Sequence, residues 1–593
     1  MNISIPLLIT IPLYLIAYFF YAKYISGVLG LDPGRKTPAI TECDNVDYAP
    51  ASHAVVFSHH FASIAGGGPI LGPTIAMIYG YKISLIWIIL GAIFFGAVHD
   101  FTSLFVSIRE KGKSMAEVAR KSLGDLGFFL FIAFTIVMLF MVIVAFLGAT
   151  VAALTSKYPL VLMGMSQDQT LLKTVVEDGI VKGKIGGIAS TSVIVITSCA
   201  PLLGFLLYIK KIPTWIAAVI ALAICAVSIE VGVRYPVMVT PDLWRIIICI
   251  YVFIAAGIPV WIILQPRDFT NSFILYIGII LCTIAIIYGG ITHFGASDPA
   301  SAFVINAPAY NFEEGGRKLG AVWPILFITI ACGAISGFHS LVAGGTSSKQ
   351  VCNEAHSKTI GYGGMLLEGV LAVIVVSVIA AGLDFSKYSE IVFPTIQGAK
   401  GNPILAFALS VGAVINACLG IPTVYGTVFG ILLVEGFVVT TLDTAVRLNR
   451  YLFEELWAIV FKNVPKILKS YIFNAALIVG LGYALAAGNT ITRVWPIFGA
   501  ANQLLAALVL IVVAVWLSDK KKPTWFVTIP AAFMLVTTIS SLVYLLYNKY
   551  MKAQNWPLVV ADLLLVALSV GVMIMLTQRF LLKKKQSAEQ AGA

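Results

Sequence analysis

The stretch FSHHFASIAGGGPILGP, residues 57–73, places two adjacent histidines, three consecutive glycines and two prolines in an otherwise apolar chain. Glycine loses more backbone freedom than other residues on becoming helical, and proline lacks the amide proton that a helix interior uses. A helix through this stretch should therefore break near its glycines. In a membrane, a break is tolerated only where the backbone is buried in protein or lines a cavity. The stretch thus predicts a broken span beside a cavity.

Composition indicates that the chain does lie in a membrane. Its 593 residues are 59% hydrophobic and 11% charged, with a mean hydropathy of +0.95, whereas soluble domains are about 25% charged. The net charge of +11 comes from Lys and Arg between apolar runs, which indicates basic loops rather than nucleic-acid binding. The eight cysteines include no CxxC pair, so neither a disulfide framework nor a zinc knuckle is expected.

Apolar runs of about 20 residues mark helical spans. The first run, at 3–22, lacks a basic start and a cleavage site, so we interpret it as a span rather than a signal peptide. Residues 403–420 are apolar enough to leave the count open. The sequence predicts about fifteen spans, near 3–22, 54–79, 83–108, 127–155, 187–209, 213–233, 244–264, 271–292, 320–344, 361–383, 421–446, 471–488, 496–517, 525–547 and 557–578.

Basic loops give the expected orientation. Segments such as REKGKSMAEVARK (109–121) and the lysines at 583–585 fall on one side of the alternating spans, and this richer side should be cytoplasmic. The N-terminus is then outside and the C-terminus inside. No loop is large enough for an independent domain. We therefore expect one integral membrane domain, 1–593.

A second stretch, SGFHSLVAGGTSSK (336–349), resembles the first, with a histidine and a serine ahead of Ala-Gly-Gly. The two glycine-interrupted spans run in opposite directions in the predicted topology, a pattern typical of inverted-repeat transporters. The free amides of a half-helix starting near Pro69 would suit a carboxylate, and the exposed carbonyls of the first half would suit a cation. Ordinary glycine packing between spans is the alternative. The substrate-binding candidates are His59, His60, Ser63, Gly66, Gly67, Gly68, His339, Ser340, Gly344 and Gly345.

Six ordered motifs over most of the chain resemble the carbon starvation protein A (CstA) family. Besides the two interrupted stretches, they are GAVHDF (96–101), IGYGGMLLEG (360–369), TTLDTAVRLNR (440–450) and WPIFGAANQLLA (495–506). The resemblance implies a bacterial or archaeal inner-membrane transporter linked to peptide uptake in carbon starvation, with relatives that import pyruvate with protons. The chain departs from the family in having His99 in place of Gln and Ser347-Ser348 in place of Thr-Pro. These differences leave substrate and coupling ion open.

The resemblance also implies the LeuT-type fold of the amino acid–polyamine–cation superfamily. The expected fold class is an all-α polytopic membrane protein of about fifteen transmembrane helices, with an inverted repeat, broken helices and extra peripheral helices. The repeats would cover 54–233 and 320–517, separated by an inserted helix pair at 244–292 and followed by extra helices at 525–578. Spans 54–79 and 320–344 would be the broken core helices.

Ionisable residues inside spans are costly and functional by default. Glu368, Glu435 and Asp100 are candidates for carrying a coupling proton, although Asp100 could instead be interfacial. In the implied fold, Thr440 and Thr441 occupy the place of a sodium-binding hydroxyl pair. Asn502 and Gln503 could line the cavity or bond across helices. Asp443 and Arg447, four residues apart, are expected to pair with each other.

A histidine titrates near neutral pH, so His59, His60 and His339 could serve a proton-coupled carrier. Adjacent helix positions point about 100° apart, so one of His59 and His60 should face the cavity. The sequence therefore predicts a secondary transporter, not an enzyme, that imports small carboxylate nutrients, either short peptides or pyruvate, with H⁺ or Na⁺. We expect no cofactor beyond the coupling H⁺ or Na⁺. Its other partners would be membrane lipids, and its oligomeric state is open. The alternatives are an ion channel and a membrane haem or metal oxidoreductase.

Overall fold

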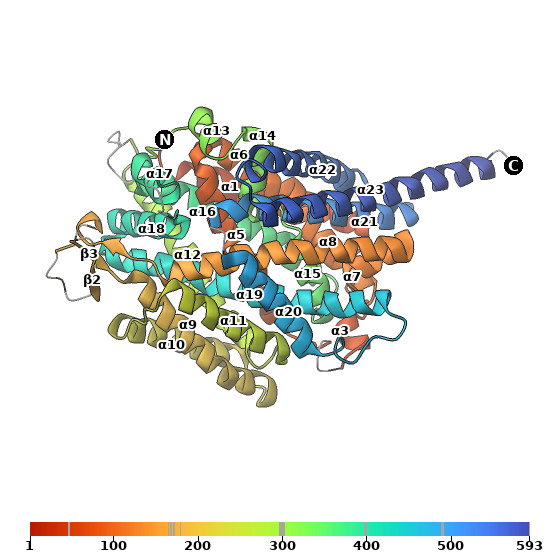
Figure 1. Cartoon of the computed structure of the whole chain (residues 1–593), viewed down its shortest axis with the longest axis horizontal. Coiled ribbons are helices and arrows are strands. Elements are labelled where there is room, and N and C mark those ends of the chain that lie inside the picture. Colours follow the sequence, from red (N-terminus) through yellow and green to blue (C-terminus); the bar gives the residue numbers. More distant parts are fainter. Residues whose placement is uncertain are drawn as a thin grey trace.

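The computed structural model describes residues 1–44, 48–163, 165–166, 169, 172–177, 179–295, 303–395, 400–487 and 491–591, with backbone alone at 122–123 and 576–591. In this part of the chain nearly all regular structure is helical (Figure 1). The first half contains α1 (Ile5–Ile16), η1 (Ala17–Tyr21), α2 (Ala22–Leu29), α3 (Pro38–Thr41), α4 (His53–Ile64), α5 (Gly68–Ala76), η2 (Met77–Tyr79), α6 (Tyr81–Gly91), η3 (Ala92–Gly96), α7 (Ala97–Arg109), α8 (Met115–Leu154), η4 (Val161–Met163), α9 (Ile185–Gly204), η5 (Phe205–Ile209), α10 (Thr214–Arg234), α11 (Pro241–Gly257) and α12 (Leu264–Thr292).

The second half continues with α13 (Phe312–Lys318), α14 (Val322–Ile330), η6 (Ala331–Gly333), α15 (Phe338–Gly345), η7 (Ser347–Lys349), η8 (Lys358–Gly363), α16 (Gly364–Gly382), α17 (Phe385–Val392), α18 (Pro403–Leu419), α19 (Thr423–Val460), α20 (Tyr471–Ala487), α21 (Ile491–Asp519), α22 (Trp525–Leu545), η9 (Leu546–Tyr550) and α23 (Trp556–Ala591). The described strands are β1 (Tyr158–Pro159), β2 (Thr174–Glu177) and β3 (Ile180–Gly183), an antiparallel sheet in the order β1-β3-β2. It lies at one end of the long helices, and α3 and the α19–α20 connection lie toward the other (Figure 1).

The predicted spans agree with the helices. Thirteen described helical segments are long and apolar enough to cross a membrane, and each corresponds to a predicted span. The predicted span 471–488 is the shorter helix α20, with residue 488 outside the described residues, and 244–264 is α11. The segment 403–420, which the sequence left open, forms the apolar 17-residue helix α18. The all-helical, polytopic fold class is therefore confirmed.

Burial separates the inner spans from the peripheral ones. The most apolar window of the segment His53–Tyr79 is wholly buried, and that of Val322–Lys349 is 94% buried. By contrast, the window in Thr214–Arg234 is 28% buried, so most of α10 faces outward. Apolar side chains exposed on a span have lipid rather than water as their natural neighbour. The two glycine-interrupted segments therefore lie at the centre of the molecule, surrounded by α8, α16, α19 and α21.

Helix α8 illustrates how local sequence sets an element. Its N-cap residue Ser114 accepts a hydrogen bond from the backbone N–H of Glu117, three residues on. This is the geometry of a capped helix start. Gly124 then adopts a left-handed backbone conformation, with φ of 71°. The glycine allows a kink between the polar first turns and the apolar span that follows.

Candidate functional site

The first interrupted span breaks where the sequence predicts. Helix α4 ends at Ile64, and α5 begins at Gly68 with Pro69 as its second residue. A Cβ on Gly66 would lie 2.1 Å from Oγ1 of Thr441, and one on Gly68 would lie 2.5 Å from Sγ of Cys332. The glycines therefore do more than weaken the helix, because they allow α19 and η6 to pack directly against the break.

The second span breaks at a different place from the one expected. The helical path is interrupted between Ile330 and Phe338, with Ala331 in a left-handed conformation at φ 39°. Gly344 and Gly345 instead form the last turn of α15. The expectation that these two glycines interrupt the span is wrong, because glycine is readily accommodated at a helix end. His339 thus follows its break, whereas His60 precedes its own.

Helix α21 satisfies the backbone groups that the second break frees. Asn502 Oδ1 accepts from the backbone N–H of Phe338 at 2.9 Å, and the Asn502 carbonyl accepts from the N–H of Gly337 at 3.0 Å. Gln503 Nε2 donates to the carbonyl of Phe327 at 2.9 Å, and Trp495 Nε1 donates to that of Thr329 at 2.9 Å. Buried polar backbone must be paired in this way. Asn502 and Gln503 therefore bond across helices and hold the break open.

A buried histidine–carboxylate cluster joins α7, α15 and α16. His339 Nδ1 lies 2.7 Å from Asp100 Oδ2, and its Nε2 lies 3.5 Å from Glu368 Oε2. His99 Nδ1 approaches the other oxygen of Asp100 at 2.7 Å. All four side chains are fully buried. Asp100 is buried inside the protein, where α7 packs against α15 and α16.

The adjacent histidines of α4 point to different partners. His60 Nδ1 lies 2.7 Å from the hydroxyl of Ser347 in η7, and α4 packs on α15, which carries His339. His59 Nδ1 lies 3.5 Å from Oδ2 of Asp268 in α12. Because neighbouring residues of a helix point in different directions, the two rings contact different polar groups. His60 is the one that faces η7, next to α15, and His59 faces α12.

A second buried charge cluster surrounds Arg267 of α12. Arg267 Nη1 lies 2.5 Å from Oδ2 of Asp443, and Nη2 lies 3.1 Å from Oδ1 of Asp268. Arg447 donates instead to the carbonyl of Ile258 at 2.7 Å. The predicted pairing of Asp443 with Arg447 is therefore wrong, because α12 brings a better-placed guanidinium against α19.

Most of the remaining predicted residues have local partners. Ser63 donates to the His59 carbonyl at 2.8 Å, and Ser340 donates to that of Gly337 at 2.7 Å, so both hydroxyls bond within their own segment. Thr440 and Thr441 donate to carbonyls one turn earlier in α19. Gly67 packs against Val438 and Phe146. Glu435 is buried, and its Oε1 has no hydrogen-bond partner.

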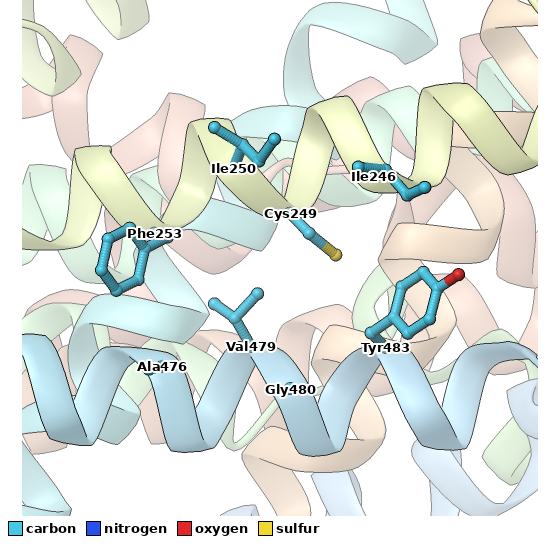
Figure 2. Close-up of a pocket in the computed structure, with 8 residues that line it drawn as sticks. All are labelled: Ile246, Cys249, Ile250, Phe253, Ala476, Val479, Gly480 and Tyr483. Carbon is cyan, nitrogen blue, oxygen red and sulfur yellow. The ribbon is translucent and has the colours of Figure 1, made fainter.

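Three cavities lie at different places relative to the two helix breaks. A cavity of about 10 Å³ lies between them, lined by Gly66, Gly68, Thr441 and mainly apolar side chains, and it has room for at most one water. A larger cavity of about 590 Å³ opens beside the start of α4 and the α11–α12 connection. Figure 2 shows the third, an apolar groove of about 390 Å³ between α11 and α20. Its lining comes from neither broken segment, so it is not the central site.

The comparisons with known proteins identify the family. The family model described as "Carbon starvation protein CstA" matches residues 3–400 and 384–541. The chain belongs to the CstA family. A peptide transporter CstA of Campylobacter jejuni is 31% identical over 89% of this chain and 78% of its own length. The Escherichia coli peptide transporter CstA is 28% identical (90% and 79% covered), and the E. coli pyruvate/proton symporter BtsT is 29% identical (89% and 80% covered).

These relatives make the chain a multi-pass membrane transporter rather than an enzyme. The predictions of family, transporter class and membrane location are thereby confirmed. Among solved structures, a manganese transporter mutant of Eremococcus coleocola is 9% identical over 90% of this chain and 99% of its own, with a TM-score of 0.49. With a TM-score below 0.5, we draw no conclusion about a shared fold from this similarity. Among the described residues, no group of three or more His, Cys, Asp or Glu could hold a metal ion.

Sequence reasoning missed Arg267, Asp268 and Tyr251. Arg267 and Asp268 fall in the short link assigned between spans 244–264 and 271–292, whereas α12 begins at Leu264 and carries both into the interior. Tyr251 lies within the predicted span 244–264, in α11. A usable signal was present, because QPRDFTN (265–271) places adjacent opposite charges between apolar runs. Charges in such a position mark function or a buried pair.

Proposed function

We propose that the protein imports small carboxylate nutrients across the bacterial or archaeal inner membrane, driven by protons, at a site formed by its two broken helices. The observation that carries the proposal is the contact of His339, which directly follows one break, with both Asp100 and Glu368. The relatives named as peptide transporters and as a pyruvate/proton symporter support the substrate class and the proton. The N-terminus would lie outside and the C-terminus in the cytoplasm.

The cluster supports proton coupling through its charges. Neither oxygen of Glu368 has a hydrogen-bond partner, and Glu368 faces a histidine that already contacts the carboxylate of Asp100. A buried carboxylate without a partner is unfavourable as an anion, and a bound proton removes that cost. The proton would be held between Glu368 and His339. Since His339 is the second residue of α15, a movement of the backbone at the break would also move the histidine that holds the proton.

The substrate would bind where the half-helices meet. The first turn of α5 and the first turn of α15 present positive dipole ends to the interior, which favours a carboxylate. The cavity of about 10 Å³ is too small for pyruvate or a peptide, so the conformation is closed around the breaks. Phe146 and Phe498 line that cavity from α8 and α21. Movement of these helices away from the breaks would admit substrate.

The cavity of about 590 Å³ fits a cytoplasmic exit. It is lined by Ala51, Ser52 and Val55 at the start of α4 and by Gln265 of α12. In the proposed orientation the start of α4 is at the cytoplasmic side. A substrate released from the breaks along α4 would reach this vestibule.

Uptake into proteoliposomes tests the proposal. Radiolabelled pyruvate and a radiolabelled dipeptide would be supplied side by side under an imposed proton gradient, a sodium gradient or none. We expect saturable uptake of one substrate class that needs the proton gradient. Uptake of pyruvate that cold dipeptide leaves unchanged would assign the monocarboxylate, and the reverse would assign the peptide. Flux without saturation or gradient dependence would instead support a channel.

Histidine variants distinguish a specific role of the proposed site in transport from a general loss of folding or stability. His339→Ala and His60→Ala should lose gradient-driven uptake, because they remove the cluster's central ring and the ring beside it. His293→Ala is the matched control, since His293 is exposed at the end of α12 and stacks on Phe303. Equal uptake by His339→Ala and His293→Ala would refute the proposed site, provided that wild type transports.

A further inference from the structure

A second buried charge network lies apart from the histidine–carboxylate cluster, where α11, α12 and α19 meet. Arg267 has no exposed surface and forms ion pairs with Asp443 and Asp268. Its Nη2 donates to Oγ1 of Thr440 at 2.9 Å, and its Nη1 donates to the hydroxyl of Tyr251. Four oxygen-bearing side chains therefore converge on one guanidinium.

The oxygens around Arg267 are those that would otherwise bind a hard cation. Carboxylate, hydroxyl and carbonyl oxygens are the usual ligands of such ions. The hydroxyl of Thr440 gives its proton to the Gly436 carbonyl at 2.8 Å, so its lone pairs are turned toward Arg267. Tyr251 in turn donates to Asp443 at 2.9 Å. The oxygens that could ligate a cation all surround the guanidinium of Arg267, which occupies the position of that cation.

We propose that the guanidinium of Arg267 occupies a monovalent-cation site between α12 and α19. Transport therefore needs no sodium. Removal of Arg267 converts the site into one that binds a free monovalent cation. The consequence for transport rests on the proposed function, whereas the cation site rests on the contacts of Arg267. In this proposal the positive charge beside Thr440 is the guanidinium of Arg267 and not a bound sodium ion.

The charge balance explains why an empty site would recruit a cation. Two buried carboxylates, Asp268 and Asp443, face the single guanidinium, and His59 lies 3.5 Å from Asp268. Removing Arg267 leaves Asp443 buried without the guanidinium and Asp268 with His59 alone, and an unpaired buried charge strongly destabilises a protein. A cation bound to the folded protein alone would restore stability by mass action.

A cavity lies near this network. The cavity of about 590 Å³ is lined by Gln265, two residues before Arg267, and by Val55, one helical turn before His59. Residues four apart on a helix lie on one face. His59, with 6% of its surface exposed, lies one turn beyond Val55 in α4 and 3.5 Å from Asp268. A small cation entering this cavity from the proposed cytoplasmic side would approach the network on its Asp268 side.

The test measures thermal unfolding of the purified full-length protein with chloride salts of sodium, guanidinium or choline at equal, low ionic strength. Wild type should unfold at the same temperature in all three. Arg267→Ala should unfold at a lower temperature in choline and recover part of the loss in sodium or millimolar guanidinium. Guanidinium is the closest probe, because it replaces the missing group itself. In proteoliposomes, wild-type uptake under a fixed proton gradient should be the same with sodium or choline.

Three variants serve as controls. Arg447→Ala removes another buried arginine of the region, one that donates to the Ile258 carbonyl and the Tyr451 hydroxyl, and it should show no cation response. Arg267→Lys keeps a compact cation in place and should stay indifferent to sodium. The double variant Arg267→Gln/Asp443→Asn removes both partners, so it should regain stability and lose most of the cation response.

The outcomes are separable. Sodium-specific stabilisation of wild type, or wild-type uptake that requires sodium, would overturn the proposal. So would an Arg267→Ala protein that is destabilised but gains nothing from any cation, since a purely structural ion pair predicts that result. If Arg267→Ala cannot be purified, the same comparison of sodium, guanidinium and choline is made with Arg267→Gln, and no gain from any cation would overturn the proposal in the same way. Absence of uptake by wild type would refute the proposed function and leave the cation measurements valid.

Discussion

Replacing Gly72 by alanine tests whether the two broken helices must touch at their breaks. Gly72 lies in α5, where it crosses the last turn of α14. A Cβ there would be 2.5 Å from the carbonyl oxygen of Ile330 and 2.8 Å from that of Thr329. Both neighbours are backbone atoms, which cannot rotate away as a side chain can.

The magnitude follows from that contact. An ordinary contact begins near 3.4 Å, so α5 and α14 must separate by about 0.9 Å. Overpacking of this kind costs about 1–3 kcal/mol. The better helix propensity of alanine over glycine offsets at most about 1 kcal/mol. We expect a net loss of about 1–2 kcal/mol in the stability of the closed conformation. Since about 1.4 kcal/mol is a tenfold change in an equilibrium constant, the ratio of closed to open protein should fall about tenfold.

The assay is thermal unfolding in one detergent together with uptake into proteoliposomes. Gly148→Ala is the matched control, because Gly148 is a half-buried helical glycine of α8 with no atom within 4 Å of an added Cβ. It should unfold at the same or a slightly higher temperature and transport normally. Gly72→Ala should unfold earlier and transport less. If the two variants behave alike, close contact at the breaks is not required and the reasoning fails.

Three further predictions concern other parts of the molecule. Glu368→Gln should abolish gradient-driven uptake yet retain exchange of labelled for unlabelled substrate, because the variant cannot release a proton; loss of exchange as well would contradict this. Asn502→Leu should lower the stability by about 1–3 kcal/mol, since it leaves the Phe338 N–H unpaired, and thermal unfolding beside Gln503→Leu would measure it. Burial would raise the pKa of Glu110, but hydrogen bonds from Lys121 and Trp516 outweigh it and hold that pKa below 4.5. Its pairing therefore stabilises the fold above about pH 4.5 and is lost as the pH falls through the lowered value, so Glu110→Gln should reduce the acid sensitivity of unfolding seen in wild type.

Much of the fold could be predicted from local sequence. Span positions follow from apolar runs, since each membrane helix satisfies its own backbone and needs no partner to be recognised. The break at 65–67 likewise follows from three glycines and a proline, whose effect on a helix is local. The sequence misplaces the second break, because Gly344 and Gly345 are as compatible with a helix end as with an interruption. The bond from the Gly337 N–H to the Asn502 carbonyl of α21 arises from tertiary packing.

The histidine–carboxylate cluster was predicted as separate residues but not as a unit. Asp100 and Glu368 are predicted because ionisable side chains in apolar spans are costly, and His339 because its stretch resembles the first interrupted one. Nothing in the sequence placed them within 4 Å of one another, because α7, α15 and α16 come together only through tertiary packing.

By itself, the sequence determined the membrane class, the positions of the spans, one broken helix and the family of the chain. The tertiary structure alone decided which charges meet. Asp443 has Arg447 one turn away yet pairs with Arg267, which is distant in the chain. The physical reason is that hydrophobicity and helix breaking act over a few residues, whereas the partner of a buried charge is set by which helices pack together.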